Sequence, residues 1–230
     1  MFKSIADSFH AGGWGMWPIA GCMVFAIAIA VERIIFLYFT VSNQKEVVLR
    51  ELYKYILRGD IGGALRFLDS QKPGPMVKVV KAGLVKVHRS DFEVQAALDQ
   101  ASLQEMPKIE ARTGFLGVLS NAAVLCGLLG TITGLIKCFG AVANVDPAQK
   151  ATILAAGISE AMNCTAFGLG VSIPALIAFA ILQARAQHLV DDINEGVVTV
   201  MNLVVGNRDQ FDLSVLQNAE GERATGTRGR

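Results

Sequence analysis

The chain has 230 residues, of which 52% are hydrophobic and 18% are charged, and its mean hydropathy is +0.43. This composition is too apolar for an ordinary soluble domain and too polar for a protein made only of membrane spans, so it indicates an integral membrane protein with a sizeable water-facing part. The net charge of +1 gives no global basic or acidic field from which a partner could be argued.

Three apolar runs are long enough to cross a bilayer as helices, at 14–38, 113–143 and 152–183. The first run is too long for the core of a signal peptide and is preceded by one basic residue, Lys3, so we interpret it as a retained anchor. Trp14 and Trp17 at one end and Tyr38 at the other resemble the aromatic residues of membrane interfaces.

Basic residues indicate the orientation of these spans. Many Lys and Arg residues fall in the connection 39–112, whereas the N-terminal flank has only Lys3 and the turn 144–151 has only Lys150. The positive-inside rule then places 39–112 and the C-terminal part in the cytoplasm and the N-terminus outside.

The connection itself predicts short helices. Apolar residues recur at helical spacing in 44–58 and 76–88, Asp60 can cap a helix that follows it, and Ser90 with Glu93 has the pattern of a capping box. We expect the helix that starts after Ser90 to continue into the second span, with a kink at Pro107.

The predicted fold is an all-α membrane protein with three transmembrane helices, whose long helices extend into a cytoplasmic helical region. The predicted segments are an outer N-terminal segment 1–13, span 14–38, cytoplasmic region 39–112, span 113–143, outer turn 144–151, span 152–183, cytoplasmic extension 184–213 and a disordered tail 214–230.

Two threonines form the strongest functional signal. Thr131 and Thr165 are equidistant from position 148, so an antiparallel hairpin that turns there brings them to one depth. At 1.5 Å per residue they lie roughly 20 Å from the turn, near the middle of a hydrocarbon layer about 30 Å thick. Matched polar side chains at that depth indicate a site. The alternative is that each hydroxyl merely bonds a carbonyl of its own helix.

Small residues surround both threonines and give each helix a narrow face. They are Gly127, Gly130 and Gly134 in the second span and Ala161, Gly168 and Ser172 in the third. Such faces either line a narrow pore or receive another helix, and plain helix packing is the simpler interpretation. Pro174 removes the backbone hydrogen bond to Gly170 and can kink the third span.

Few titratable residues lie near these spans. Glu160 is a carboxylate well inside an apolar run, roughly 12 Å from the outer end of the third span, and it is either functional or exposed to water at the rim. Glu32 and Arg33 are interpreted as an interfacial anchor. We interpret the cysteines as small buried hydrophobes and expect no metal site, because the histidines are isolated and no CxxC pair occurs.

Together, these motifs resemble the proton-channel signature of the MotA/TolQ/ExbB family, and span order favours its TolQ/ExbB-like branch. The matching segments are Leu128-Leu129-Gly130-Thr131, Gly134, Gly157-Ile158-Ser159-Glu160-Ala161, Cys164-Thr165-Ala166-Phe167-Gly168-Leu169, Ile173-Pro174-Ala175 and Val31-Glu32-Arg33. One departure is Ala123, where many relatives have proline.

The resemblance implies a bacterial inner-membrane motor without cofactors. Its subunits form a homo-oligomer, a five-fold ring, around the single transmembrane helices of an ExbD/TolR-like partner with a membrane aspartate. Proton flow then drives work on a periplasmic or outer-membrane machine, in TonB-type uptake, Tol-Pal upkeep or gliding. Thr131, Thr165 and Ser172 would belong to the pore and Glu160 to its acidic position.

Two other function classes compete with this one. A non-conducting membrane scaffold would use the glycine strip only to oligomerise. A small transporter or membrane enzyme is disfavoured, because the sequence shows no inverted repeat, catalytic pair or cofactor motif.

Overall fold

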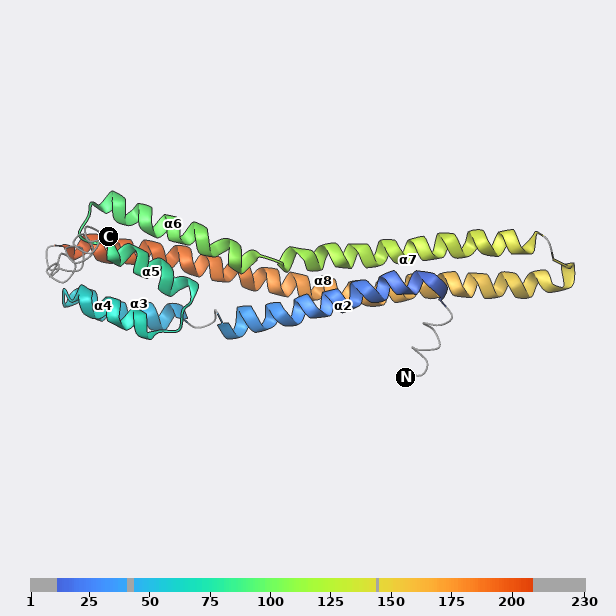
Figure 1. The fold of residues 1–230 in the computed structure, drawn as a ribbon, viewed down its shortest axis with the longest axis horizontal. Helices are drawn as coiled ribbons and strands as arrows, with labels where there is room; N and C mark the ends of the chain where they lie inside the picture. Colours follow the sequence, from blue (N-terminus) through green and yellow to red (C-terminus); the bar gives the residue numbers. More distant parts are fainter. Residues whose placement is uncertain (1–11, 41–43, 144, 209–230) are drawn as a thin grey trace, which may run out of the picture. The chain divides into compact units, whose positions relative to one another are not determined.

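A computed structural model describes residues 12–40, 44–143 and 145–208, and the elements found there are helices (Figure 1). The predicted all-α architecture is therefore confirmed. The chain divides into two compact units, one formed by 1–34 with 112–184 and the other by 35–111 with 185–230. The predicted outer segment, apart from its last two residues, and the predicted disordered tail lie outside the described residues.

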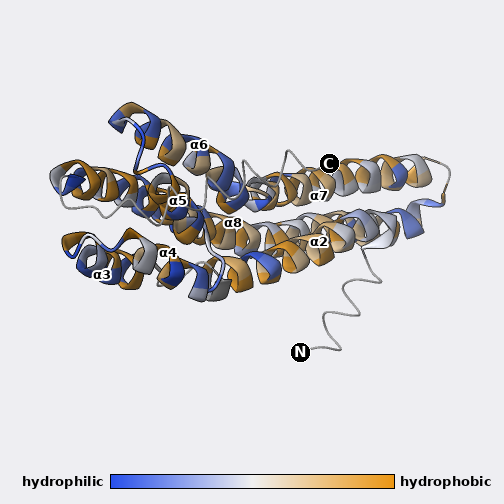
Figure 2. Cartoon of the chain, turned by 60° about the vertical axis from the view of Figure 1, so that its left-hand side comes forward, coloured by the Kyte–Doolittle hydropathy of each residue, from blue (hydrophilic) through white to orange (hydrophobic). Residues whose placement is uncertain are grey.

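The first unit contains the membrane helices. Helix α2 (Met16–Ile34) follows a short turn η1 (Gly13–Gly15), α7 spans Thr113–Val142, and α8 (Pro147–Gly206) begins in this unit. The residues that the structure describes contain three helical stretches long and apolar enough to cross a membrane, and each includes one of the predicted spans in whole or in large part. Figure 2 shows hydrophobic residues along α2.

Helix α8 begins at Pro147, inside the segment predicted as the outer turn. Proline is well suited to the first turn of a helix, because its fixed φ matches the helix and its missing N–H would have no partner there. The connection between α7 and α8 is therefore shorter than the sequence pattern indicated.

The second unit is a helical bundle whose helices carry both polar and apolar residues. Its elements are η2 (Ile35–Thr40), α3 (Gln44–Leu57), α4 (Ile61–Ser70), α5 (Pro75–Val85), α6 (Asp91–Glu110) and the part of α8 from residue 185. Apolar side chains at helical spacing, such as Leu52, Ile56, Val80, Leu84 and Leu98, form its buried core.

Both predicted caps are present in this bundle. The Asp60 carboxylate accepts a hydrogen bond of 2.6 Å from the Gly63 amide at the start of α4. Ser90 and Glu93 form the capping box of α6, in which each side chain accepts a hydrogen bond from the other residue's amide. These contacts fix where the two helices begin.

The expected continuous helix from Ser90 into the second span is interrupted. Helix α6 ends at Glu110, and Arg112 adopts a left-handed conformation with φ 63° before α7 begins. Ala111 ends α6 because its backbone, with ψ 146°, leaves the helical conformation, and the left-handed Arg112 is the residue just before α7. Pro107 lies inside α6, so the break occurs five residues beyond the position expected to disturb it.

Candidate functional site

The Thr131 and Thr165 hydroxyls meet between α7 and α8. The two Oγ1 atoms are hydrogen-bonded, and Thr131 Oγ1 also lies 3.1 Å from the Ala161 carbonyl of α8. Thr131 lies 3.1 Å from the Gly127 carbonyl of its own helix as well, and Thr165 lies 3.4 Å from that carbonyl across the interface. The pair therefore joins α7 and α8. The carbonyl of its own helix is only one of several hydrogen-bond partners within reach of the Thr131 hydroxyl.

Thr133 provides a contrast on the same helix. Its hydroxyl lies 2.9 Å from the Leu129 carbonyl and 3.1 Å from the Gly130 carbonyl, both within α7. It thus adopts the self-bonded arrangement that was the alternative for Thr131.

Glycines bring the two helices into backbone contact around the threonines. A Cβ on Gly168 would lie 2.8 Å from the Ala123 carbonyl oxygen, and one on Gly127 would lie 3.0 Å from the Cys164 carbonyl oxygen. A Cβ on Gly130 would lie 2.8 Å from that of Cys164. These positions leave no room for a side chain, so the short side chains of this strip set the helix separation.

Gly134 lies at the same interface, one helical turn closer to the connection. A Cβ there would be 3.3 Å from the Cβ of Ala161, which is tight but less severe than at Gly168. The close approach thus extends along several turns of α7.

A second hydroxyl pair lies further from the connection. Ser120 Oγ is 2.7 Å from Ser172 Oγ and donates a 3.0 Å hydrogen bond to the Ser172 carbonyl, and both side chains are buried. Ser172 was predicted as a pore residue, but Ser120 was missed. Ser120 and Ser172 are equidistant from position 146, whereas the threonines are equidistant from position 148. Symmetry about 148 places Val124 opposite Ser172, so the pattern that paired the threonines does not predict the contact with Ser120.

The threonine pair lies close to the start of the first span. A Cβ on Gly15, in the turn before α2, would lie 3.1 Å from the Cα of Gly130, the neighbour of Thr131. The pair is therefore level with the first turn of the first span. Thr131 lies about 27 Å along α7 from Thr113, so the pair lies toward the end where the first span begins.

Glu160 also lies beside the start of α2. It is half-buried, and a side chain on Gly13, which has φ 65°, would collide with its carboxylate. One turn away, Cys164 Sγ donates a 3.0 Å hydrogen bond to the Gly12 carbonyl. The glycines that precede the first span thus make room for two side chains of α8, a role that the sequence interpretation did not assign to them.

Glu32 and Arg33 lie at the other end of this unit. Glu32 accepts a 2.5 Å hydrogen bond from the Arg112 guanidinium, which joins the end of α2 to the residue just before α7. Arg33 is only 4% exposed within the unit. Pro174, in turn, lines an apolar groove of about 340 Å³ with residues of α2, α7 and α8.

Hydroxyl groups can donate and accept hydrogen bonds but do not titrate near neutral pH. Within residues 12–34, 112–143 and 145–184, the carboxylates are those of Glu32, Asp146 and Glu160. Glu160 lies five residues from Thr165, about 7.5 Å along the helix. The threonine level thus offers hydrogen-bonding groups without a carboxylate of its own.

The described residues form no cluster of three or more potential metal ligands. Cys138 and Cys164 are buried and Cys22 and Cys126 are half-buried, and all four are free thiols. Their positions on α2, α7 and α8 agree with the interpretation that they act as small apolar residues.

Comparison with known proteins gives a family match over the candidate site. A sequence model of the MotA/TolQ/ExbB proton channel family matches residues 71–195. The chain is 30% identical over 168 residues to the putative biopolymer transport protein ExbB-like 3 of Synechocystis sp., covering 73% of this chain and 79% of the relative.

Two further relatives agree with this match, and one solved structure has a similar fold. The putative biopolymer transport protein ExbB homolog of Methanothermobacter thermautotrophicus is 25% identical over 225 residues, which cover 94% of this chain and 79% of that protein. The Tol-Pal system protein TolQ of Pseudomonas aeruginosa is 38% identical over 97 residues, 42% of each chain. The fold resembles that in the structure of C. jejuni MotAB, with a TM-score of 0.63 and 15% identity, over 92% of this chain and 81% of that one.

Proposed function

Because this chain belongs to the MotA/TolQ/ExbB proton channel family, we propose that it is the stator and channel subunit of a proton-driven membrane motor. Its relatives include proteins named ExbB and TolQ, and members of this family are transport components and not enzymes. The motor would couple proton flow to work on a periplasmic or outer-membrane partner, as in TonB-type uptake, Tol-Pal upkeep or gliding.

The observation that carries this proposal is the hydroxyl pair of Thr131 and Thr165. A proton-powered device needs a titratable group near its polar site, and the described part of the membrane unit has no carboxylate at that level. We infer that an ExbD/TolR-like single-span partner supplies an aspartate there. A buried carboxylate without hydrogen bonds is costly, and the two hydroxyls would reduce that cost.

Glu160 would act at the entrance to this site. Its carboxylate lies beside Gly13 and about 7.5 Å along α8 from Thr165, between the threonine pair and the α7–α8 connection. A carboxylate in that position can attract protons and hold water without itself occupying the partner's site.

We propose that the subunits form a homo-oligomeric ring, a pentamer, with α7 and α8 toward its axis. The apolar groove that contains Pro174 would receive a neighbouring copy. The ring would lie in a bacterial inner membrane with its N-terminus in the periplasm and 39–112 in the cytoplasm, as the distribution of basic residues indicates. Native mass spectrometry should show an oligomer, and a stable monomer would contradict the ring.

The decisive experiment compares the chain alone with the chain and its partner. Proteoliposomes that carry both should take up protons when a membrane potential is applied, and those with the chain alone should not. An asparagine in place of the partner's membrane aspartate should abolish the uptake. No proton uptake in any of the three preparations would favour the alternative of a non-conducting scaffold. Equal uptake in all three would refute the role given to the partner's aspartate.

A further inference from the structure

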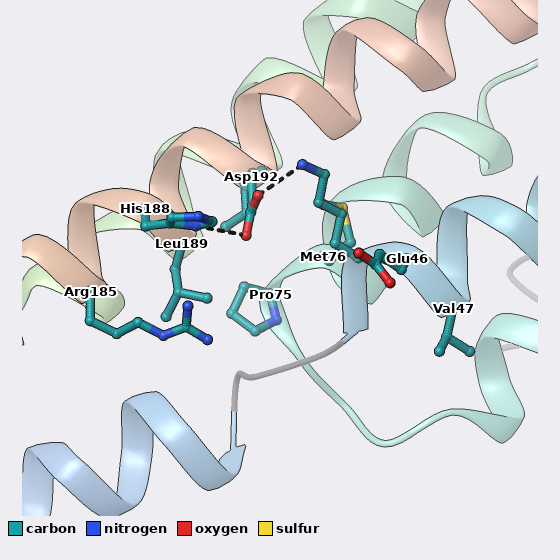
Figure 3. Close-up of a pocket in the computed structure, with 10 residues that line it drawn as sticks. Glu46, Val47, Pro75, Met76, Arg185, His188, Leu189 and Asp192 are labelled. Atoms are coloured by element: carbon teal, nitrogen blue, oxygen red, sulfur yellow. Dashed lines mark hydrogen bonds and ion pairs between the residues drawn. The ribbon is translucent and has the colours of Figure 1, made fainter.

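The second unit, formed by 35–111 with 185–230, contains a cavity that the proposed proton path does not use. It has a volume of about 410 Å³ and is lined by the beginnings of α3 and α5 and by one face of α8 (Figure 3). All of its lining residues belong to the unit of 35–111 and 185–230. The apolar part of the lining consists of Val47, Pro75, Met76, Leu189 and Ile193.

The cavity lies where apolar sequence gives way to polar sequence. Tyr38 is the last residue of the first candidate span, and the apolar run of α8 ends at Gln183. The Arg185 guanidinium lies 5.5 Å from the centre of the Tyr38 ring, a cation–π contact. Tyrosine and arginine together are typical of the level of lipid headgroups.

The charges around the cavity are mixed. Lys45 donates hydrogen bonds to Asp192 at 2.8 Å and to Glu195 at 2.6 Å, and these bonds raise the pKa of Lys45 above its ordinary value. The lysine charge is thus balanced within the protein. His188 Nδ1 lies 3.2 Å from the other oxygen of Asp192.

Arg185 and Glu46 add one positive and one negative side chain to the lining. In Figure 3 the Arg185 guanidinium is turned toward Pro75, and Glu46 lies on the other side of that proline. A lining that is positive at one end and negative at the other favours a zwitterion over an anion, since Glu46 would repel a purely anionic ligand.

We propose that this cavity binds the headgroup of a zwitterionic phospholipid of the phosphatidylethanolamine type. Arg185 binds the phosphate, because a guanidinium matches phosphate geometry, and Glu46 binds the ammonium group. Val47 and Leu189 contact the glycerol and the first carbons of the acyl chains. This site concerns the membrane character of the chain and is independent of proton conduction.

The test measures lipid retention by the full-length protein. The protein is reconstituted in vesicles of equal parts phosphatidylethanolamine and phosphatidylglycerol, released gently, and its bound lipids are counted by native mass spectrometry. The wild type should retain phosphatidylethanolamine in preference. Glu46→Gln and Arg185→Gln should each reduce that retention about tenfold, the effect of losing one charged hydrogen bond.

Matched controls are Arg50→Gln and Glu110→Gln, two exposed residues that do not line the cavity, and these variants should retain lipid as the wild type does. Equal retention of the two lipids by the wild type would overturn the proposal, as would unchanged retention in both cavity variants. Soluble phosphoethanolamine should compete poorly, because it lacks the carbons that contact Val47 and Leu189. Effective competition by it would show a site for a soluble metabolite and refute the lipid assignment.

Discussion

Removing both threonine hydroxyls should strongly reduce proton uptake while lowering the stability of the α7–α8 hairpin only slightly. Thr131→Val and Thr165→Val keep the branched shape of each side chain and delete only the hydroxyl. Both residues lie in continuous helices, so the backbone has no reason to move. The variants therefore address the hydrogen bonds alone.

The expected magnitudes follow from the contacts of the pair. The double variant loses the bond between the two hydroxyls and that from Thr131 to the Ala161 carbonyl. Bonds between membrane helices contribute about 0.6 kcal/mol each, so the loss of stability is on the order of 1 kcal/mol. A hydrogen bond to a carboxylate contributes about 1.5–3 kcal/mol, so each hydroxyl should change the population of a bound, ionised partner aspartate by roughly tenfold to a hundredfold.

The assay is proton uptake by proteoliposomes that contain the chain and its partner, with oligomer mass measured in parallel. Each single variant should assemble and conduct at least about tenfold less than the wild type, and the double variant should be nearly inactive. Thr133→Val is the matched control, because that hydroxyl bonds only its own helix, and it should conduct normally. Normal conduction by an assembled double variant would refute the role given to the pair.

Three further outcomes are expected. Gly168→Ala should destabilise the protein by about 1–3 kcal/mol in chemical unfolding, because the new Cβ meets the Ala123 carbonyl. Gly140→Ala is the control and should be neutral or stabilising, because no atom lies within 4 Å of the new Cβ. Equal effects of the two variants would contradict the close contact at Gly168. Glu160→Gln should assemble yet show reduced proton uptake, and full uptake would make it a rim residue. The partly exposed ion pairs of Lys45 with Asp192 and Glu195 should contribute about 1 kcal/mol to the free energy of unfolding. Because these pairs raise the pKa of Lys45 in the folded state, their contribution should be present below about pH 10 and lost as the pH rises through that raised pKa. Lys45→Met should remove this alkaline loss in thermal melts followed by circular dichroism.

Local sequence patterns predicted much of the architecture. Apolar length identified the spans, and the caps at Asp60 and Ser90 were visible because they depend on side chains within three residues of each other. The contact of Thr131 with Thr165 was also accessible, because an antiparallel hairpin pairs residues by their distance from its turn.

Contacts between the α7–α8 hairpin and other parts of the chain could not be predicted from local sequence patterns. The level of the threonines is set by where α2 begins, and nothing in the second or third span encodes that position. The contact of Glu160 with Gly13 likewise joins residues far apart in the sequence. The break at Arg112 was missed because arginine has no marked preference for a left-handed conformation, so its sequence carries no signal for the end of α6.

The backbone contact between α7 and α8 has a mechanical consequence. Side chains that interdigitate can change rotamer and let two helices slide, but at Gly127 and Gly168 the main chains themselves touch and have no such freedom. We therefore expect α7 and α8 to move as one rigid body along this contact. A displacement applied at one end of the α7–α8 hairpin would therefore reach its other end. Flexibility would instead lie at helix contacts where longer side chains meet.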